Sequence, residues 1–268
     1  MKEKTNTDKT KKAPEALPKK QVWKTIFYIL ALMLWVFASI IASQIVVGYI
    51  MAWTIGAEAL MKPVPTAVYS ALSYVVAMLM IIMVPALLAR KYPKWHNGAT
   101  SRKALGLHNW PTWTDLGLAP VGYILYLVLA GELMALFSLF PWFNSGEVQE
   151  VGFSYYVLGF DRVVAFVTLV LVAPIAEEII FRGWLYGKMR EALAKQYSNK
   201  VSIIVSILLV SLVFGIVHLQ WNVGVNVFAL SLVLCGLREI TGTIHSGIFL
   251  HILKNGIAFY LLFVLGMG

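Results

Sequence analysis

Long apolar runs separated by short polar or basic segments dominate the chain from residue 23 onward. About 20 consecutive apolar residues let an α-helix cross the hydrocarbon core of a bilayer. Seven runs are candidates, and the sixth is only about half a span long. They cover residues 23–53, 66–89, 116–140, 163–186, 201–219, 223–237 and 243–265. The pattern predicts an all-α fold, a polytopic membrane helix bundle of about seven transmembrane helices with a short sixth one.

Composition supports a membrane protein. Hydrophobic residues make up 59% of the chain and charged residues 13%. Soluble domains carry about 25% charged residues, so the charge that a water-exposed surface needs is absent. We therefore expect one membrane domain at residues 23–268. Residues 1–22 are rich in Lys and contain Pro14 and Pro18, which predicts a disordered basic tail. A secretory signal peptide is the alternative, but the run 23–53 is longer than an h-region.

The basic residues are distributed unevenly. Of the 22 Lys and Arg residues, eight lie between residues 2 and 24 and five between residues 90 and 103. This asymmetry follows the positive-inside rule and predicts a cytoplasmic N-terminus. Contact with a lipid bilayer explains the net charge of +9, so no nucleic-acid partner is expected. We expect a multi-pass protein of the cell membrane, and the compact basic tail without organelle signals is typical of a bacterial one.

Two adjacent carboxylates, Glu177 and Glu178, lie inside an apolar stretch. An ionised carboxylate in hydrocarbon is costly and usually marks function. Glu178 and Arg182 are spaced i,i+4 and can pair on one helix face, whereas Glu177 is rotated about 100° away. We predict that Arg182 neutralises Glu178 while Glu177 stays free to accept a proton. The alternative is an ion-pair network of all three that only holds helices together. Glu132 in the third run is a weaker candidate for lining the same cavity as these carboxylates.

Two later histidines are predicted to reach the same depth. Glu177 lies 20 or 21 residues before the turn at 197–199, and His218 lies as many after it. At 1.5 Å per residue on both helices they should lie level, with His251 within roughly 10 Å of that layer. His251 and Asn255 are spaced i,i+4 and can together orient a carbonyl and stabilise an oxyanion. For either histidine alone, an interhelical hydrogen bond is the alternative.

Three motifs resemble those of a known family. Residues 177–182 fit Glu-Glu-x-x-x-Arg, residues 214–218 fit Phe-x-x-x-His, and residues 251–255 fit His-x-x-x-Asn. In this order, each on an apolar helix, they resemble the CAAX proteases and bacteriocin-processing enzymes, the CPBP or Abi family. The resemblance covers a catalytic core at about residues 115–268.

The resemblance implies an intramembrane endopeptidase similar to type II CAAX prenyl endopeptidases. Glu177 and His218 would activate the attacking water, and His251 with Asn255 would form the oxyanion site. The Glu178–Arg182 pair would support them. The implied partner is a membrane-associated peptide or protein substrate, whose identity the sequence leaves open.

The need for a metal also stays open. Glu177, His218 and His251 could ligate zinc, because two His and one Glu form a known ligand set. However, no His-Glu-x-x-His helix is present in the sequence, and we favour a metal-free, glutamate-dependent mechanism without a cofactor. The rival function is a transporter, or a non-catalytic immunity or scaffold protein, that uses the same buried polar groups. Transporters usually show repeated halves with broken helices, and the sequence has no such repeat.

Overall fold

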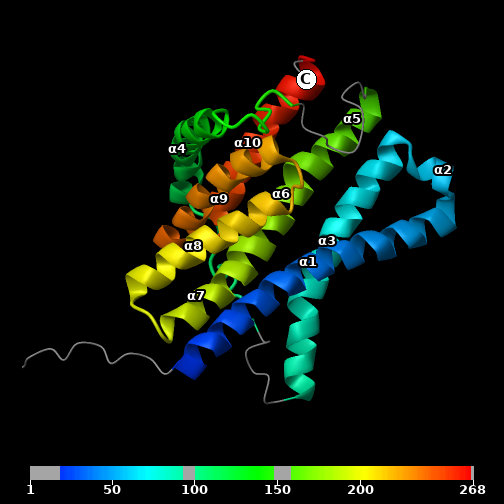
Figure 1. Ribbon diagram of the computed structural model, residues 1–268. Helices are drawn as coiled ribbons and strands as arrows, with labels where there is room; N and C mark the ends of the chain where they lie inside the picture. Colours follow the sequence, from blue (N-terminus) through cyan, green and yellow to red (C-terminus); the bar gives the residue numbers. More distant parts are fainter. Residues whose placement is uncertain (1–18, 93–99, 148–157, 267–268) are drawn as a thin grey trace, which may run out of the picture.

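The computed structural model describes residues 19–92, 100–147 and 158–266, and the regular structure in these segments is helical (Figure 1). Seven of the described helices are long and apolar enough to cross a membrane, which confirms the predicted all-α, multi-pass bundle. Outside the fourth span, the helices are α1 (Lys19–Ile55), α2 (Ala57–Leu60), α3 (Pro63–Lys91), α4 (Trp113–Phe137), α8 (Asn199–Ile216), α9 (Trp221–Thr241), α10 (His245–Phe259) and its continuation η4 (Tyr260–Val264).

The fourth span, residues 159–194, is one continuous helix whose hydrogen-bond pattern changes along its length. Its segments are α5 (Gly159–Phe166), η2 (Val167–Val172), α6 (Ala173–Glu177), η3 (Glu178–Leu185) and α7 (Tyr186–Ala194), of which η2 and η3 are π-helical. Pro174 has no backbone N–H to donate to the carbonyl four residues earlier, which favours a wider turn at η2. Such π turns are frequent at functional sites, and the paired glutamates lie where α6 passes into η3.

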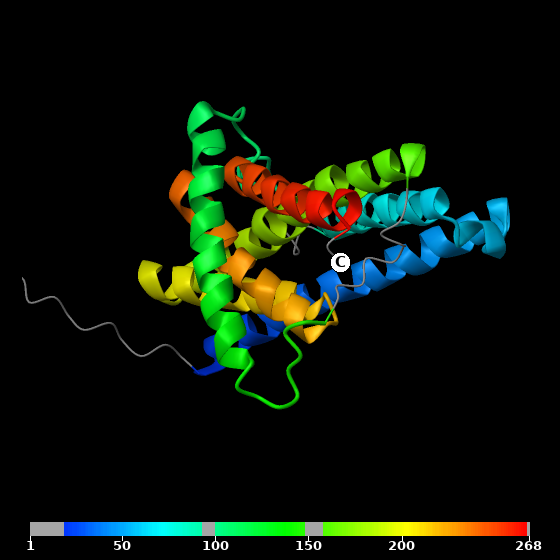
Figure 2. The ribbon, with the colours of Figure 1, turned by 90° about the horizontal axis from the view of Figure 1, so that it is seen from above.

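The fourth span lies at the centre of the bundle. On one side α1 and α3 cross each other and are joined at one end through α2 (Figure 1). On the other side α8, α9 and α10 contact it, and α4 covers α9 and α10 (Figure 2). Half of the residues in its most apolar stretch are buried, compared with 22% in that of α1 and 17% in that of α3. A carboxylate on this helix is therefore surrounded by protein rather than by lipid.

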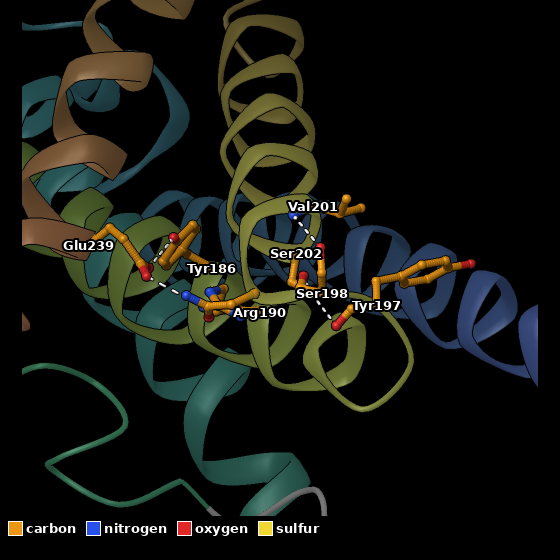
Figure 3. A network of polar contacts seen from close by, with 8 residues as sticks. Tyr186, Arg190, Tyr197, Ser198, Val201, Ser202 and Glu239 are labelled. Carbon is orange, nitrogen blue, oxygen red and sulfur yellow. Dashed lines mark hydrogen bonds and ion pairs between the residues drawn. The ribbon is translucent and has the colours of Figure 1, made fainter. Parts of the chain in front are cut away.

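Polar contacts tie the lower part of the fourth span to α9. The hydroxyl of Tyr186 donates to Oε2 of Glu239 at 2.6 Å, and the guanidinium of Arg190 lies 3.5 Å from the other oxygen (Figure 3). Ser198 caps α8 by accepting from the backbone N–H of Val201 at 3.4 Å. The contacts of Tyr186 and Arg190 join α7 to α9 about two to three helical turns below the paired glutamates.

The beginnings of α4 and α10 are joined in a similar way. Asp115 and Thr112 form a capping box at the start of α4. The buried Asp115 carboxylate also accepts from the hydroxyl of Ser246 at 2.6 Å. Because Ser246 lies near the first residue of α10, this bond sets the height of α10 and thereby that of His251.

The observed spans begin and end at other residues than the apolar runs, and the sixth is a full span of 21 residues rather than about half a span. The sixth span, α9, extends beyond the apolar run 223–237 at both ends, and α8, with 18 residues, is the shortest of the described spans. An apolar run marks only the part of a helix that has apolar side chains. The helix α9 continues beyond that run through Glu239, which pairs with Tyr186. It ends at Gly242, whose φ is 71°. Of the predicted tail, residues 1–18 lie outside the described residues, and α1 begins at Lys19.

Candidate active site

Glu178 lies in a closed cluster of charges. Its Oε1 accepts from Arg182 at 3.0 Å and from Nδ1 of His251 at 2.9 Å. Glu178 and Arg182 have no exposed surface, and His251 is 3% exposed. The guanidinium of Arg182 also lies 4.3 Å from the ring centre of Phe214, a cation–π contact. The i,i+4 pairing inferred from the spacing is therefore present, and α10 adds a third partner.

A glycine lets α10 approach this cluster. A Cβ on Gly247 would lie 3.0 Å from Oε2 of Glu178, which is tighter than almost all observed contacts of that kind. Gly247 is one turn before His251, so both residues are on the same face of α10. The missing side chain thus permits the short bond between His251 and Glu178.

Glu177 points toward a cavity instead. The cavity has a volume of about 200 Å³, and Glu177 and His218 both line it. Its other walls come from α1, α3 and η3. Tyr74 on α3 also lines the cavity, and its hydroxyl lies near the Glu177 carboxylate. The neighbouring glutamates therefore face different surroundings, as the 100° offset between consecutive helical residues predicts.

The hydrogen bond of His218 defines its tautomer. The residue lies in the turn after α8, and its Nδ1 is 2.7 Å from the backbone carbonyl of Phe214. A carbonyl oxygen only accepts, so Nδ1 carries the proton and Nε2 of the neutral ring has a free lone pair. Burial lowers the pKa of His218, although the charge of Glu177 opposes this shift. The geometry thus provides a proton acceptor beside Glu177.

His251 links the two glutamates. Its Nδ1 bonds to Glu178, and its Nε2 lies 3.6 Å from Oε2 of Glu177. The ring of Phe214 packs against it with ring centres 6.0 Å apart. His251 is therefore held from two sides, and Nε2 is the nitrogen nearer to Glu177.

Asn255 lies one turn beyond His251 on α10, but its amide has a partner of its own. Nδ2 donates to the backbone carbonyl of Leu169, in the π-helical segment η2, at 2.9 Å. Asn255 and Lys254 line a separate small pocket of about 60 Å³. The structure therefore brings Glu177, Glu178, Arg182 and His251 into contact and places His218 on the shared cavity, whereas Asn255 contacts none of them in the described bonds.

The site residues were also candidates for binding a metal ion. Among residues 19–92, 100–147 and 158–266, no group of three or more His, Cys, Asp or Glu side chains is arranged to hold a metal ion. Nδ1 of His218 and Nδ1 of His251 are both engaged in hydrogen bonds, to a carbonyl and to a carboxylate. Zinc ligation by Glu177, His218 and His251 would use Nε2 of each histidine, because hydrogen bonds at Nδ1 are compatible with a metal on the other ring nitrogen.

Sequence reasoning missed the contribution of α3. Tyr74 and Ser73 line the cavity, although α3 lies far from the motifs in the sequence. Hydroxyl groups that recur every three or four residues in an otherwise apolar run are the signal that could have revealed it. The suggestion that Glu132 lines the same cavity is wrong, because Glu132 is exposed on α4 and is not part of the cavity wall.

Comparison with known proteins supports the motif assignment. Residues 159–257 match the protein-family model described as Type II CAAX prenyl endopeptidase Rce1-like. The match spans all three motifs, from Glu177 to Asn255. No curated protein and no solved structure matches the chain. The match confirms the predicted resemblance, and residues 159–257 are similar to the CAAX protease-like family.

Proposed function

We propose that the protein is a glutamate-dependent intramembrane endopeptidase that hydrolyses peptide bonds of membrane-associated substrates. The observation that carries this proposal is that Glu177 and His218 line one cavity, with the lone pair of Nε2 on His218 free to accept a hydrogen bond from water. The family match supports a protease of the CAAX type. The multi-pass helical fold supports a substrate that reaches the site from the membrane.

In the proposed reaction, Glu177 and His218 orient a water molecule against the carbonyl carbon of the scissile peptide bond. As the water oxygen bonds to that carbon, its proton passes to Glu177, and the carbonyl oxygen becomes an oxyanion. The carbon–nitrogen bond then breaks, and the same proton passes to the leaving amine. A positioned general base and acid of this kind contributes roughly 10²–10⁴-fold to a rate.

His251 and Asn255 are the proposed donors to the oxyanion. Nδ1 of His251 already donates to Glu178, so Nε2 donates to an oxyanion when the ring carries two protons. The adjacent carboxylates of Glu177 and Glu178 balance that charge. Asn255 uses one of its two amide hydrogens on Leu169 and keeps the second for the substrate. The Glu178–Arg182 pair holds His251 in place.

The location, orientation and substrates of the protein are proposed from its sequence. We place the protein in the cell membrane with its basic N-terminus in the cytoplasm, because basic residues gather at that end of the spans. The proposed substrates are membrane-associated peptides or protein C-termini, and the proposed role is their processing, in bacteriocin immunity, pheromone processing or another pathway. Hydrolysis proceeds without a metal in this scheme, since the Glu–His pair itself activates the water.

The test compares membrane peptides in cells that carry the native protein or Glu177→Gln. Hydrolysis predicts that uncleaved peptides accumulate in the Glu177→Gln cells and that purified native protein cleaves them in liposomes. Glu132→Gln is the matched control, because it makes the same change in another span at an exposed position. A Glu177→Gln protein that fully replaces the native one would support a non-catalytic immunity, scaffold or transport role instead.

A further inference from the structure

One wall of the active-site cavity is built by helices outside the matched domain. The cavity residues on α3 recur every three or four positions, which places them on one helix face. They are Tyr69, Ser70, Ser73, Tyr74 and Ala77, and α1 adds Ile40, Ser43 and Gln44. Both helices precede the matched segment 159–257. The family domain thus carries the proposed reacting groups, while α1 and α3 supply the opposite surface.

Hydrogen bonding separates Ser73 from its neighbours. The hydroxyl of Tyr69 donates to the backbone carbonyl of Gln44 at 3.3 Å, and that of Tyr74 lies near the carboxylate of Glu177. Ser73 is 6% exposed, and within the described part of the chain its Oγ has no hydrogen-bond partner. Buried polar groups are nearly always hydrogen-bonded. A buried hydroxyl on the cavity wall is therefore available to a group that enters the cavity.

The chemistry of this wall suits a peptide rather than a hydrocarbon chain. Serine, tyrosine and glutamine side chains alternate along it and offer both donors and acceptors. A second groove, of about 320 Å³ between α8, α9 and the end of α4, shows the contrast. Its lining is mostly apolar and includes Phe137, Leu212, Trp221 and Phe228, with Gln220 as the polar exception among the aliphatic and aromatic side chains. An apolar chain would bind better there than between α1 and α3.

Resting on the proposed function, we propose that the α1–α3 wall is the substrate-binding subsite and takes an extended, unprenylated peptide segment. Ser73 bonds to the peptide backbone beside the scissile bond, and Tyr74 holds the Glu177 carboxylate in position. The aromatic rings of Tyr69, Tyr74 and Phe181 and a volume of about 200 Å³ restrict the bound segment to small side chains. The segment runs along α3 from Glu177 toward Ser70 and the exposed Gln44.

The test measures binding separately from cleavage. The probe is a fluorescent synthetic peptide with Ala and Gly around the cleaved bond, bound to full-length Glu177→Gln protein in detergent. Adding Ser73→Ala should raise the dissociation constant of the peptide roughly 3–10-fold, as expected for one lost hydrogen bond. The matched control is Ser39→Ala, because Ser39 is also buried with an unpartnered Oγ but does not line the cavity. The control should leave binding within about twofold of the parent protein.

With native Glu177, Ser73→Ala should raise KM with kcat unchanged, because the bond is made in both ground and transition state. Replacing Ala and Gly of the probe by Leu and Trp should abolish binding. Equal effects of Ser73→Ala and Ser39→Ala, or equal binding of the bulky probe, would overturn the subsite. Dependence on Ser73 only for a farnesylated probe would overturn it as well. If Glu177→Gln cleaves normally the hydrolytic mechanism fails, and the binding comparison still decides the subsite.

Discussion

The helix around residues 177 and 178 has two faces with different surroundings. Glu178 faces a closed cluster, in which Arg182 and His251 occupy the same carboxylate oxygen. Glu177 faces a cavity of about 200 Å³ that His218 also lines. Both carboxylates are buried, with exposed fractions of 0% and 8%.

A shift of one position along the helix therefore separates a carboxylate held by ion pairs from one that can react. A buried charge that is paired with neighbouring side chains makes the fold sensitive to the loss of a partner, and it has no room for a substrate. A charge that borders a cavity can meet a substrate, because water and a peptide can reach it. The following predictions test this division between the closed and the open face.

The largest effect is expected for Glu177→Gln on the open face. We predict that the hydrolysis rate falls by roughly 10²–10⁴-fold, because the amide cannot accept the proton of the attacking water. The thermal unfolding midpoint in detergent should stay close to that of the native protein. Peptide cleavage and unfolding are measured on the same preparation, with Glu132→Gln as control. A folded and fully active Glu177→Gln protein would remove the general base from the mechanism.

Arg182→Ala tests the closed face. Removal of the cation leaves Glu178 buried without its charge partner, and the expected loss of stability is about 3–5 kcal/mol. We predict a low folded yield and a lower midpoint of unfolding. Lys195→Ala is the control, since Lys195 pairs with Glu191 at the same i,i+4 spacing, at 2.8 Å, but both side chains are more than half exposed. Similar losses in the two variants would show that burial does not set the strength of the pair.

Asn255→Ala distinguishes a donor to the oxyanion from a purely structural amide. If Asn255 donates to the transition state, the single-turnover rate should fall by roughly 10²–10³-fold. Loss of the bond to Leu169 alone would lower stability and leave the rate almost unchanged. Asn226→Ala is a suitable comparison, because Asn226 accepts from Tyr126 at 2.7 Å away from the cavity. An unchanged rate in Asn255→Ala would assign the oxyanion site to His251 only.

The smallest effect is expected from chelation. In the metal-free scheme, exhaustive treatment with a zinc chelator should leave activity within about twofold, and elemental analysis should find no stoichiometric zinc. A metal held by Glu177, His218 and His251 would instead be lost together with activity when any one ligand is replaced. Recovery of activity on adding one equivalent of zinc would show that hydrolysis depends on the metal.

Local patterns in the sequence determined the helical spans and the pairing within the fourth one. Apolar runs located seven spans, because a helix must satisfy its own backbone in hydrocarbon over a length set by the bilayer. The i,i+4 spacing of Glu178 and Arg182 predicted their pair, and the 100° rotation predicted that Glu177 turns elsewhere. These are properties of one helix, and neighbouring residues suffice to define them.

Contacts between helices were decided only by the tertiary structure. The partnership of His251 with Glu178 needed Gly247 to let α10 approach, and the bond of Asn255 to Leu169 involved a π-helical segment that the apolar pattern did not predict. Ser73 and Tyr74 became part of the site because α3 packs against the fourth span. Periodicity defines which face of a helix is polar, but which helix that face meets depends on packing and tilt summed over the whole bundle.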